Sequence, residues 1–402
     1  MECRDGSRNL RAIPFLVFFF VLRVLNGAPL DLRDETSSVA GGPALSILHD
    51  PENLLQFQDL RRPDIAGRFS DSTEEAPNLG FTNYPCWGRL VVRNHSQRSD
   101  WILLFEYPRT DVLDVYIAGE TRLQHFVTGD HLPFSTRPIP HQGFALPLLI
   151  APGSTTTIHF RMQTEGTLQM PVRILTPAAL ADSSTREAAF LFLIYGIMIA
   201  MLAYNLFLFF SIRHLSYLYY VFYIFSAVLL QMSFNGMADR YIWGEWVWWS
   251  DRSFVILTIL NILLAVIFSR RFLQLESSWP TGNRISHVFV ALALFACILS
   301  FWLPLAISTR IGASMAMAGI TFIVICAILL NWKGYQPARY FLLAWGTFLI
   351  GAAVYGLQKA GFLPRIFWTE YMYQIGTAIE VIVLSLALGD RINHLQNQIR
   401  SE

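Results

Sequence analysis

Seven apolar stretches, each about as long as a bilayer is thick, follow one another in the second half of this chain. They occupy residues 188–211, 216–235, 252–273, 285–305, 311–332, 338–358 and 368–390. A helix needs about 20 apolar residues to cross a bilayer, and lipid admits only helices and closed barrels. The segment 186–392 is therefore predicted to be an all-α bundle that crosses the membrane seven times.

The overall composition agrees with a membrane protein. Of 402 residues, 53% are hydrophobic and 15% are charged, with a mean hydropathy of +0.40. Soluble proteins carry about one quarter charged residues. Tryptophan and tyrosine cluster in "YIWGEWVWWSD", which is typical of a membrane interface. The net charge of +1 comes without a dense basic patch, so the lipid bilayer is a predicted partner and nucleic acid is not.

The N-terminus has the pattern of an export signal. Three arginines precede the apolar run "IPFLVFFFVL", and the small-residue segment "RVLNGA" follows it. This run is shorter than a spanning helix, which favours a signal peptide over residues 1–28. An uncleaved anchor is the alternative. With either, the domain that follows is exported.

The exported domain alternates apolar and polar residues with a period of two. Examples are "WILLFEY", "VLDVYI" and "TTTIHFRM", and turn-rich segments such as "APGS" and "TEGT" separate them. Short alternating runs of this kind are typical of antiparallel strands that bury one face. Residues 45–178 are therefore predicted to form an exported all-β sandwich of the jelly-roll type, with 29–44 as a linker before it.

One segment of this domain fits no strand and supplies the candidate ligand-binding residues. "TGDHLPFSTRPIPH", residues 128–141, is stiffened by three prolines and offers Asp130, His131, Arg137 and His141. With Trp87, a ring on which a sugar could stack, these residues predict a ligand site at the sandwich edge. The alternatives are a loop whose polar groups face water and a tryptophan in the core.

No pattern predicts catalysis, a cofactor or a metal. Cys86 is the single cysteine of the exported domain, so neither a disulfide framework nor a CxxC site is predicted there. The spans contain no HExxH, no Walker motif and no lysine in the last helix that could hold retinal. The chain is therefore predicted not to be an enzyme, with no cofactor and no metal.

A few polar residues inside the spans are candidates for a switch. They are Asn205, Asn261 and, above all, Glu380. A charged side chain at the bilayer centre costs about 2.5–3.5 kcal/mol, so Glu380 is expected to face other helices, with Asn205 and Asn261 as candidate partners. The alternative is a static hydrogen bond that holds two helices together.

Glycines recur in the last two spans, at Gly346, Gly351, Gly356 and Gly376. Small residues let membrane helices approach closely. Helix packing is their predicted role.

The number of spans and the distribution of charge predict the orientation. Seven spans after an exported domain place the C-terminus in the cytoplasm. The inside segments would carry Arg213, Arg270, Arg271, Arg284, Lys333, Arg339, Arg391 and Arg400, and the outside loops Arg240, Arg252, Arg310, Lys359 and Arg365. Eight cations against five agree with the positive-inside rule.

The C-terminal residues 393–402 are predicted to begin a cytoplasmic signalling helix. Leu388, Ile392, Leu395 and Ile399 recur at coiled-coil spacing, which favours a homodimer through this helix. A short amphipathic tail is the alternative. No output domain follows in this sequence, so either the chain is truncated or a separate cytoplasmic protein provides the output.

Several stretches resemble one family of receptors. They include "NLGFTNYPCWGRLVVRN", "DWILLFEYPRTDVLDVYI" and "TGDHLPFSTRPIP" in the exported part, and "TEYMYQIGTAIEVIVLSLALGDRIN" in the last span. In this order, over about residues 45–395, the chain resembles the bacterial seven-transmembrane receptors with diverse intracellular signalling modules, with their type 2 extracellular domain. The resemblance implies a carbohydrate-binding-like jelly roll and a seven-helix transducer, which in relatives precedes a cyclase, kinase or phosphatase.

These observations predict a receptor in the bacterial inner membrane. An extracytoplasmic small molecule or glycan would bind the exported domain, and the helices would relay the event to a cytoplasmic output. A metal ion or a partner protein as ligand stays open. The alternatives are a transporter or channel with a periplasmic cap, and a carbohydrate-binding scaffold without transduction.

Overall fold

The computed structural model describes residues 28–401 except 83, 120–122, 360, 361 and 365. The predicted signal peptide, residues 1–28, lies outside the described residues apart from its last position. The backbone of the C-terminal helix is described, but the side chains of the predicted coiled-coil seam beyond Leu388 are not.

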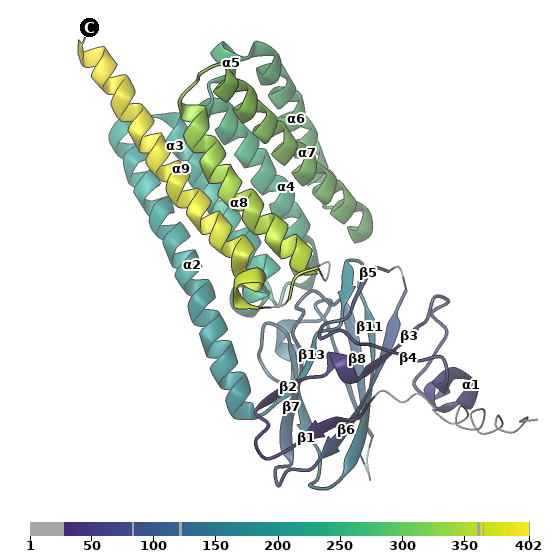
Figure 1. The fold of residues 1–402 in the computed structure, drawn as a ribbon. Helices are drawn as coiled ribbons and strands as arrows, with labels where there is room; N and C mark the ends of the chain where they lie inside the picture. The colour runs from purple at the N-terminus through teal and green to yellow at the C-terminus, as the bar shows by residue number, and fades with distance from the viewer. Residues whose placement is uncertain (1–27, 83, 120–122, 360–361, 365, 402) are drawn as a thin grey trace, which may run out of the picture.

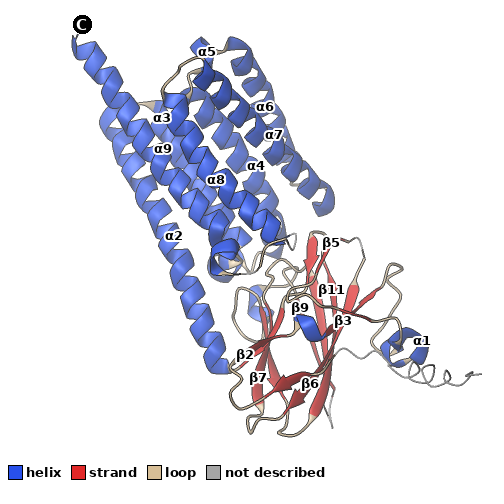
Figure 2. Cartoon of the chain, in the orientation of Figure 1, coloured by secondary structure: helices blue, strands red, loops and turns tan. Residues whose placement is uncertain are grey.

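The β-rich domain consists mainly of two sheets that face each other, within the part of the chain that the structure describes (Figure 2). The first has the order β4 (Ser70–Asp71), β3 (Leu45–His49), β6 (Cys86–Asn94), β11 (Thr155–Gln163), β8 (Val112–Ala118) and β9 (Leu123–Thr128). The second has the order β10 (Phe144–Leu149), β7 (Asp100–Phe105), β13 (Val172–Leu175) and β2 (Ser38–Ala40). β12 (Thr167–Gln169) pairs with β5 (Asn78–Phe81), and α1 (Pro63–Ala66) is a single short turn.

Alternate residues of both sheets form the core between them. Strand β11 alternates buried and partly exposed positions along its length, as its sequence predicts. Phe160 of β11 meets Phe105 of β7 edge to face, with ring centroids 4.9 Å apart. A Cβ at Gly88 would lie 2.2 Å from the Phe160 ring, so the glycine in β6 makes room for it. The predicted β-rich fold of this domain is confirmed, while its jelly-roll connectivity stays a prediction.

The segment predicted as a linker, residues 29–44, contributes strands to both sheets. Strand β1 (Leu30–Leu32) pairs in parallel with β6, and β2 pairs with β13. Leu32 is fully buried in the sandwich core. A three-residue strand is too short for its alternation to be recognised in a sequence, because two or three residues alternate by chance.

Seven helices in the described residues are long and apolar enough to cross a membrane. They are α2 (Pro177–Ile212), α3 (Leu215–Phe234), α4 (Val247–Phe272), α6 (Pro280–Leu299), α7 (Leu305–Trp332), α8 (Pro337–Lys359) and α9 (Phe367–Ser401). A short turn, α5 (Leu275–Ser278), lies between α4 and α6. The predicted seven-helix bundle is confirmed.

Helix α2 begins directly after the last strand of the sandwich. The Thr176 side chain accepts a hydrogen bond from Ala179 N at 3.2 Å, and Pro177 occupies the first turn, which together form a strong helix start. The first turns of α2 run beside the β-domain before the bundle begins (Figure 1). Leu180 packs there against Ile102 and Leu104 of β7. The sandwich and α2 are thus joined without a flexible connection.

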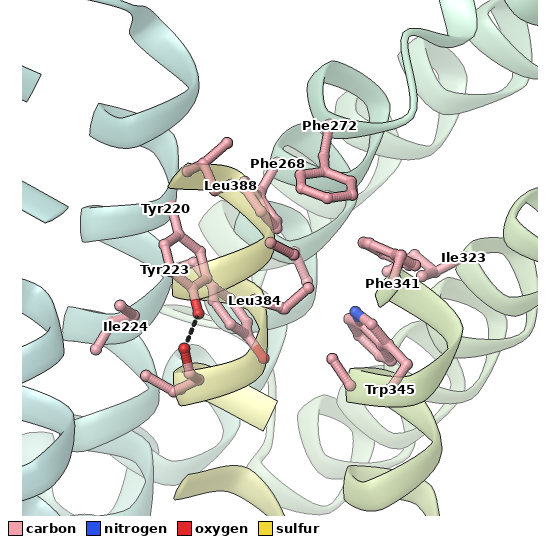
Figure 3. Packing of buried hydrophobic residues seen from close by; sticks show 14 of the residues in the cluster. Tyr220, Tyr223, Ile224, Phe268, Phe272, Ile323, Phe341, Trp345, Leu384 and Leu388 are labelled. Carbon is pink, nitrogen blue, oxygen red and sulfur yellow. Dashed lines mark hydrogen bonds between the residues drawn. The ribbon is translucent and has the colours of Figure 1, made fainter. Parts of the chain in front are cut away.

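The β-domain and the C-terminus lie at opposite ends of the bundle (Figure 1). Large apolar side chains such as Phe207, Phe210 and Leu343 point outward with 60–67% of their surface exposed, as expected of side chains in contact with lipid. Inside, aromatic rings from α3, α4 and α8 pack together with Leu384 and Leu388 of α9 (Figure 3): Tyr220, Tyr223, Phe268, Phe272, Phe341 and Trp345.

Helices α8 and α9 approach each other most closely at a pair of glycines. A Cβ at Gly351 would lie 2.4 Å from the Met372 carbonyl oxygen, and a Cβ at Gly376 would lie 2.9 Å from that of Thr347. Gly346 and Gly356 have no neighbouring atom within 4 Å of such a Cβ among the described residues. The packing role predicted for these glycines therefore applies to Gly351 and Gly376.

Candidate functional site between the β-domain and the helices

The segment predicted to bind ligand, residues 128–141, docks onto the membrane bundle. Its Phe134 N donates to the Gly244 carbonyl at 3.0 Å. Ser135 donates through its backbone N and its Oγ to the two carboxylate oxygens of Glu245, each at 2.9 Å. A Cβ at Gly244 would lie 2.7 Å from Phe134 Cβ, so the glycine permits this approach. The segment is a contact between domains.

Arg137 and His141 brace the end of that segment from inside. Arg137 Nη1 donates to the carbonyls of His141 and Gln142 at 2.8 and 3.0 Å. Its guanidinium lies over the rings of Phe134 and Phe144 at 4.7 and 4.5 Å from their centroids. Burial lowers the pKa of Arg137 to about 10. The Arg137 side chain therefore stabilises the conformation of the segment 128–141.

His141 is a buried neutral ring. Its Nδ1 accepts a hydrogen bond from Gly143 N at 2.9 Å. Burial, and then the nearby cations Arg240 and Arg137, lower the pKa of His141 to about 4. It is thus uncharged at neutral pH.

Arg109, which the sequence did not single out, inserts from the β-domain into the helices. Its Nη2 donates to the carbonyl oxygen and Oγ of Ser233 at 2.9 and 2.5 Å, at the end of α3. The guanidinium lies 5.3 Å from the ring centroid of Phe254 in α4. A charge in the turn before β8, in "YPRTDV", is the available sequence signal, but such charges usually face water.

A cluster of ionisable side chains lies beside Arg109. Asp111, Asp130 and His131 have ligand-type atoms within 4.8 Å of one another. Asp251 of α4 joins them from the bundle, with its Oδ2 3.8 Å from His131 Nε2. Burial, followed by the negative charge of Asp111, raises the pKa of Asp130 well above its ordinary value. The sequence identified Asp130 and His131 but not their two acidic neighbours.

A polar cavity of about 270 Å³ lies between the two domains. The β-domain lines it with Glu106, Arg109, His141 and Gln142 among others, and helices α2, α3, α8 and α9 line the opposite wall. Gln142 Nε2 donates to Glu187 Oε2 of α2 at 2.8 Å, which closes one side. A small polar ligand in this cavity would contact the sandwich and the bundle together.

Trp87 lies apart from the other predicted ligand-binding residues. It is 1% exposed and packs against Leu48, Leu60, Ile65 and Phe69 on the outer face of the first sheet. It does not line the cavity between the domains. Its surroundings are those of a core residue.

The polar residues of the last helix contact α2 and α3. Gln374 Nε2 donates to Asn235 Oδ1 at 3.0 Å, next to the cavity. The Tyr223 hydroxyl donates to Glu380 Oε1 at 2.8 Å, while Glu380 Oε2 has no partner among the described residues. Glu380 is fully buried, as predicted for a residue that faces other helices.

Asn205 and Asn261, the predicted candidate partners of Glu380, are hydrogen-bonded to other groups. Asn205 Nδ2 donates to Ser385 Oγ at 2.9 Å, and Asn261 Nδ2 donates to Ser226 Oγ at 2.9 Å. Tyr223, for which the sequence predicted no role, is the partner of Glu380. An aromatic hydroxyl in an apolar span gives no sequence signal of where it points.

Comparison with known proteins assigns both parts of the chain. The family described as 7TM diverse intracellular signalling matches residues 187–391, and the one described as 7TMR-DISM extracellular 2 matches residues 42–176. No curated protein matches the chain significantly. Neither matched domain is catalytic in itself, and seven candidate spans make this a multi-pass membrane protein of receptor type. Since the first match spans half of the chain, the protein belongs to the 7TM diverse intracellular signalling family, and it carries that family's type 2 extracellular domain in front of the helices.

Proposed function

We propose that the protein is a signal-transducing receptor of the bacterial inner membrane, and that a small polar, glycan-like ligand binds in the cavity between the β-domain and the helices. The domain would lie in the periplasm and the C-terminus in the cytoplasm. The observation that carries this proposal is the make-up of the cavity wall: residues of the β-domain and residues of four helices line the same cavity. A ligand shifts a conformational equilibrium only if it contacts the two states differently, and a shared wall provides such contacts.

Helix α9 supplies the route from the cavity to the other end of the bundle. Gln374 lines the cavity, and Glu380 and Ser385 follow it on the same buried helix. The helix continues beyond Gly389 to Ser401, which adds about 18 Å at 1.5 Å per residue. A displacement of α9 at the cavity would therefore arrive at the cytoplasmic end, where a coiled-coil dimer or a separate output protein could receive it.

Glu380 is placed to bias such a displacement. Its carboxyl lies at the contact of α9 with α3, where it accepts a hydrogen bond from the Tyr223 hydroxyl. A rotation of α9 would break this bond and force the group to find another donor, which is expensive away from water. Glu380 would thus hold α9 in one of two positions, with Asn205 and Asn261 fixing the helices around it.

The test uses the full chain with a diguanylate cyclase fused behind Glu402 as a reporter. Membranes that hold the fusion are exposed to a panel of monosaccharides and oligosaccharides, and cyclic dinucleotide formation is measured. We expect at least one sugar to change the output. Gln169→Leu, which alters the cavity wall, should raise the half-maximal sugar concentration at least tenfold.

Gln124→Leu is the matched control, because it makes the same substitution on edge strand β9 outside the cavity. If the half-maximal sugar concentration is the same in both variants, the ligand does not bind in this cavity. Sugar flux into proteoliposomes without any change in output would favour a transporter instead.

A further inference from the structure

We propose that Asp111, Asp130 and His131 form a binding site for a divalent transition-metal ion of the Zn²⁺ or Mn²⁺ class, and that Asp251 completes this site from the membrane bundle. The site lies at the junction but beside the cavity, since none of the four residues lines it.

The backbone brings the three sandwich residues together. Gly129 has φ +150°, and a Cβ there would lie 2.1 Å from the Asp111 carbonyl oxygen. Only glycine allows this approach, which places Asp130 and His131 directly against Asp111. Thr164 Oγ1 donates to Asp111 Oδ1 at 3.0 Å and Glu165 N donates to Oδ2 at 2.7 Å, so the carboxylate is oriented. Fixed outer contacts of this kind orient metal ligands in proteins.

The distances suit ligands of one ion better than direct hydrogen bonds. His131 Nε2 lies 3.9 Å from Asp111 Oδ2 and 3.8 Å from Asp251 Oδ2. Hydrogen bonds between such groups would be about 2.7–3.2 Å long. Two ligands held about 2.1 Å from one ion at a tetrahedral angle are about 3.4 Å apart. A contraction of about half an ångström would therefore bring His131 and its two acidic neighbours to this spacing, and Asp130 lies within 4.8 Å of His131 and Asp111.

The buried carboxylate of Asp130 favours a bound cation at this position. The residue is 7% exposed, and its Oδ1 has no hydrogen-bond partner in the described part of the chain. Asp251 Oδ1 is likewise without a partner among the described residues. Buried carboxylate oxygens are otherwise satisfied, because leaving one unpaired is costly. A bound cation would satisfy both.

The charge balance sets the charge of the ion. Asp111, Asp130 and Asp251 contribute three negative charges, and Arg109 contributes one positive charge, with its Nη1 4.0 Å from Asp130 Oδ2. Metal ligands bind as carboxylates and as neutral imidazole, so in the metal-bound form two negative charges remain, which a dication would neutralise. Carboxylates alone would favour Mg²⁺ or Ca²⁺, but an imidazole nitrogen among them favours Zn²⁺ or Mn²⁺.

The ion would tie the sandwich to helix α4, because Asp251 belongs to α4 and the other ligands belong to the sandwich. This bridging role rests on the proposed receptor function, whereas metal binding itself does not. The two ideas are therefore tested by different measurements: binding needs no signalling output.

The experiment titrates the purified full chain in lipid nanodiscs. The protein carries no polyhistidine tag and is first stripped with a chelator. Calorimetry then follows binding of Zn²⁺, Mn²⁺, Ca²⁺ and Mg²⁺, each as the chloride. We expect one Zn²⁺ or Mn²⁺ per chain, with affinity at least tenfold higher than for Ca²⁺ or Mg²⁺. His131→Gln, Asp130→Asn and Asp251→Asn should each weaken binding at least tenfold.

His125→Gln is the matched control. His125 Nε2 lies 3.6 Å from Asp114 Oδ1, a similar histidine–aspartate pair, but His125 is half exposed and has no third ligand in the cluster. It should bind the metal as the unmodified protein does. Failure of the unmodified protein to bind any ion saturably would overturn the site without recourse to variants. Equal metal affinity in His131→Gln and His125→Gln, or a preference for Ca²⁺ over Zn²⁺ and Mn²⁺, would overturn the assignment of the ligands. Unchanged metal affinity in Asp251→Asn would overturn the proposal that the ion links the sandwich to α4.

Discussion

The close approach of α8 and α9 gives a sharp prediction for Gly351→Ala. The added Cβ would lie 2.4 Å from the Met372 carbonyl oxygen, whereas ordinary van der Waals contact begins at 3.4 Å. The two helices must therefore separate by about 1 Å at this point. The contact atom belongs to the backbone of α9, so no side chain can rotate away. Overpacking of a well-packed interface typically costs about 1–3 kcal/mol, and we expect the free energy of unfolding to fall by that amount.

Gly346→Ala provides the matched control on the same helix, because nothing described lies within 4 Å of its Cβ. It should leave stability unchanged or raise it by up to about 1 kcal/mol through the higher helix propensity of alanine. Unfolding of both variants by sodium dodecyl sulfate in mixed micelles, followed by tryptophan fluorescence, measures the difference. If Gly351→Ala unfolds at the same detergent fraction as Gly346→Ala, the seam does not have the packing described here.

Three further substitutions test the contacts of the site. Tyr223→Phe removes the donor to Glu380 and should lower the free energy of unfolding by about 1 kcal/mol in the same detergent assay; added to Glu380→Leu, which has no acceptor, it should cost almost nothing. Arg109→Gln should lower the stability of the full chain by about 1.5–3 kcal/mol, seen in its thermal midpoint, because charged hydrogen bonds to Ser233 are lost. The pKa of His141 is lowered to about 4 in the folded state, so the unfolded chain binds a proton first and stability falls as the pH drops from about 6.5 to 4. His141→Gln should flatten that part of a stability–pH curve; an unchanged slope would refute the assignment.

Strands and membrane spans could be predicted because they depend on residues that lie close together in the sequence. Alternation in "TTTIHFRM" predicted strand β11, and apolar length predicted the spans, because period and length are local properties. The sequence also indicated that Glu380 faces other helices, since burial follows from the energy of a charge in lipid.

The contacts that build the site could not be predicted in this way. Arg109 and Ser233 are 124 positions apart, and nothing in either segment indicates the other. Asp251 lies in the aromatic run "YIWGEWVWWSD", which reads as a membrane interface, and its approach to His131 depends on how the sandwich docks. A sequence without aligned relatives contains no signal for such a docking.

The connections of the sandwich explain why α9 rather than α2 is expected to move. Helix α2 leaves β13 without a linker, and Leu180 packs on β7, so α2 and the sandwich form one body. Helix α9 follows α8 rather than a strand, and its residue Gln374 lines the cavity between the two domains. Its contact with α8 is closest at Gly351 and Gly376, and beside these glycines the Tyr373 ring of α9 packs against Phe348 and Tyr355 of α8, with ring centroids 5.8 and 6.2 Å apart. Under the proposed receptor function, a ligand in the cavity would displace α9 relative to α2 and the sandwich, and the hydrogen bonds of Tyr223 and Asn205 would limit the displacement to positions in which their partners are satisfied.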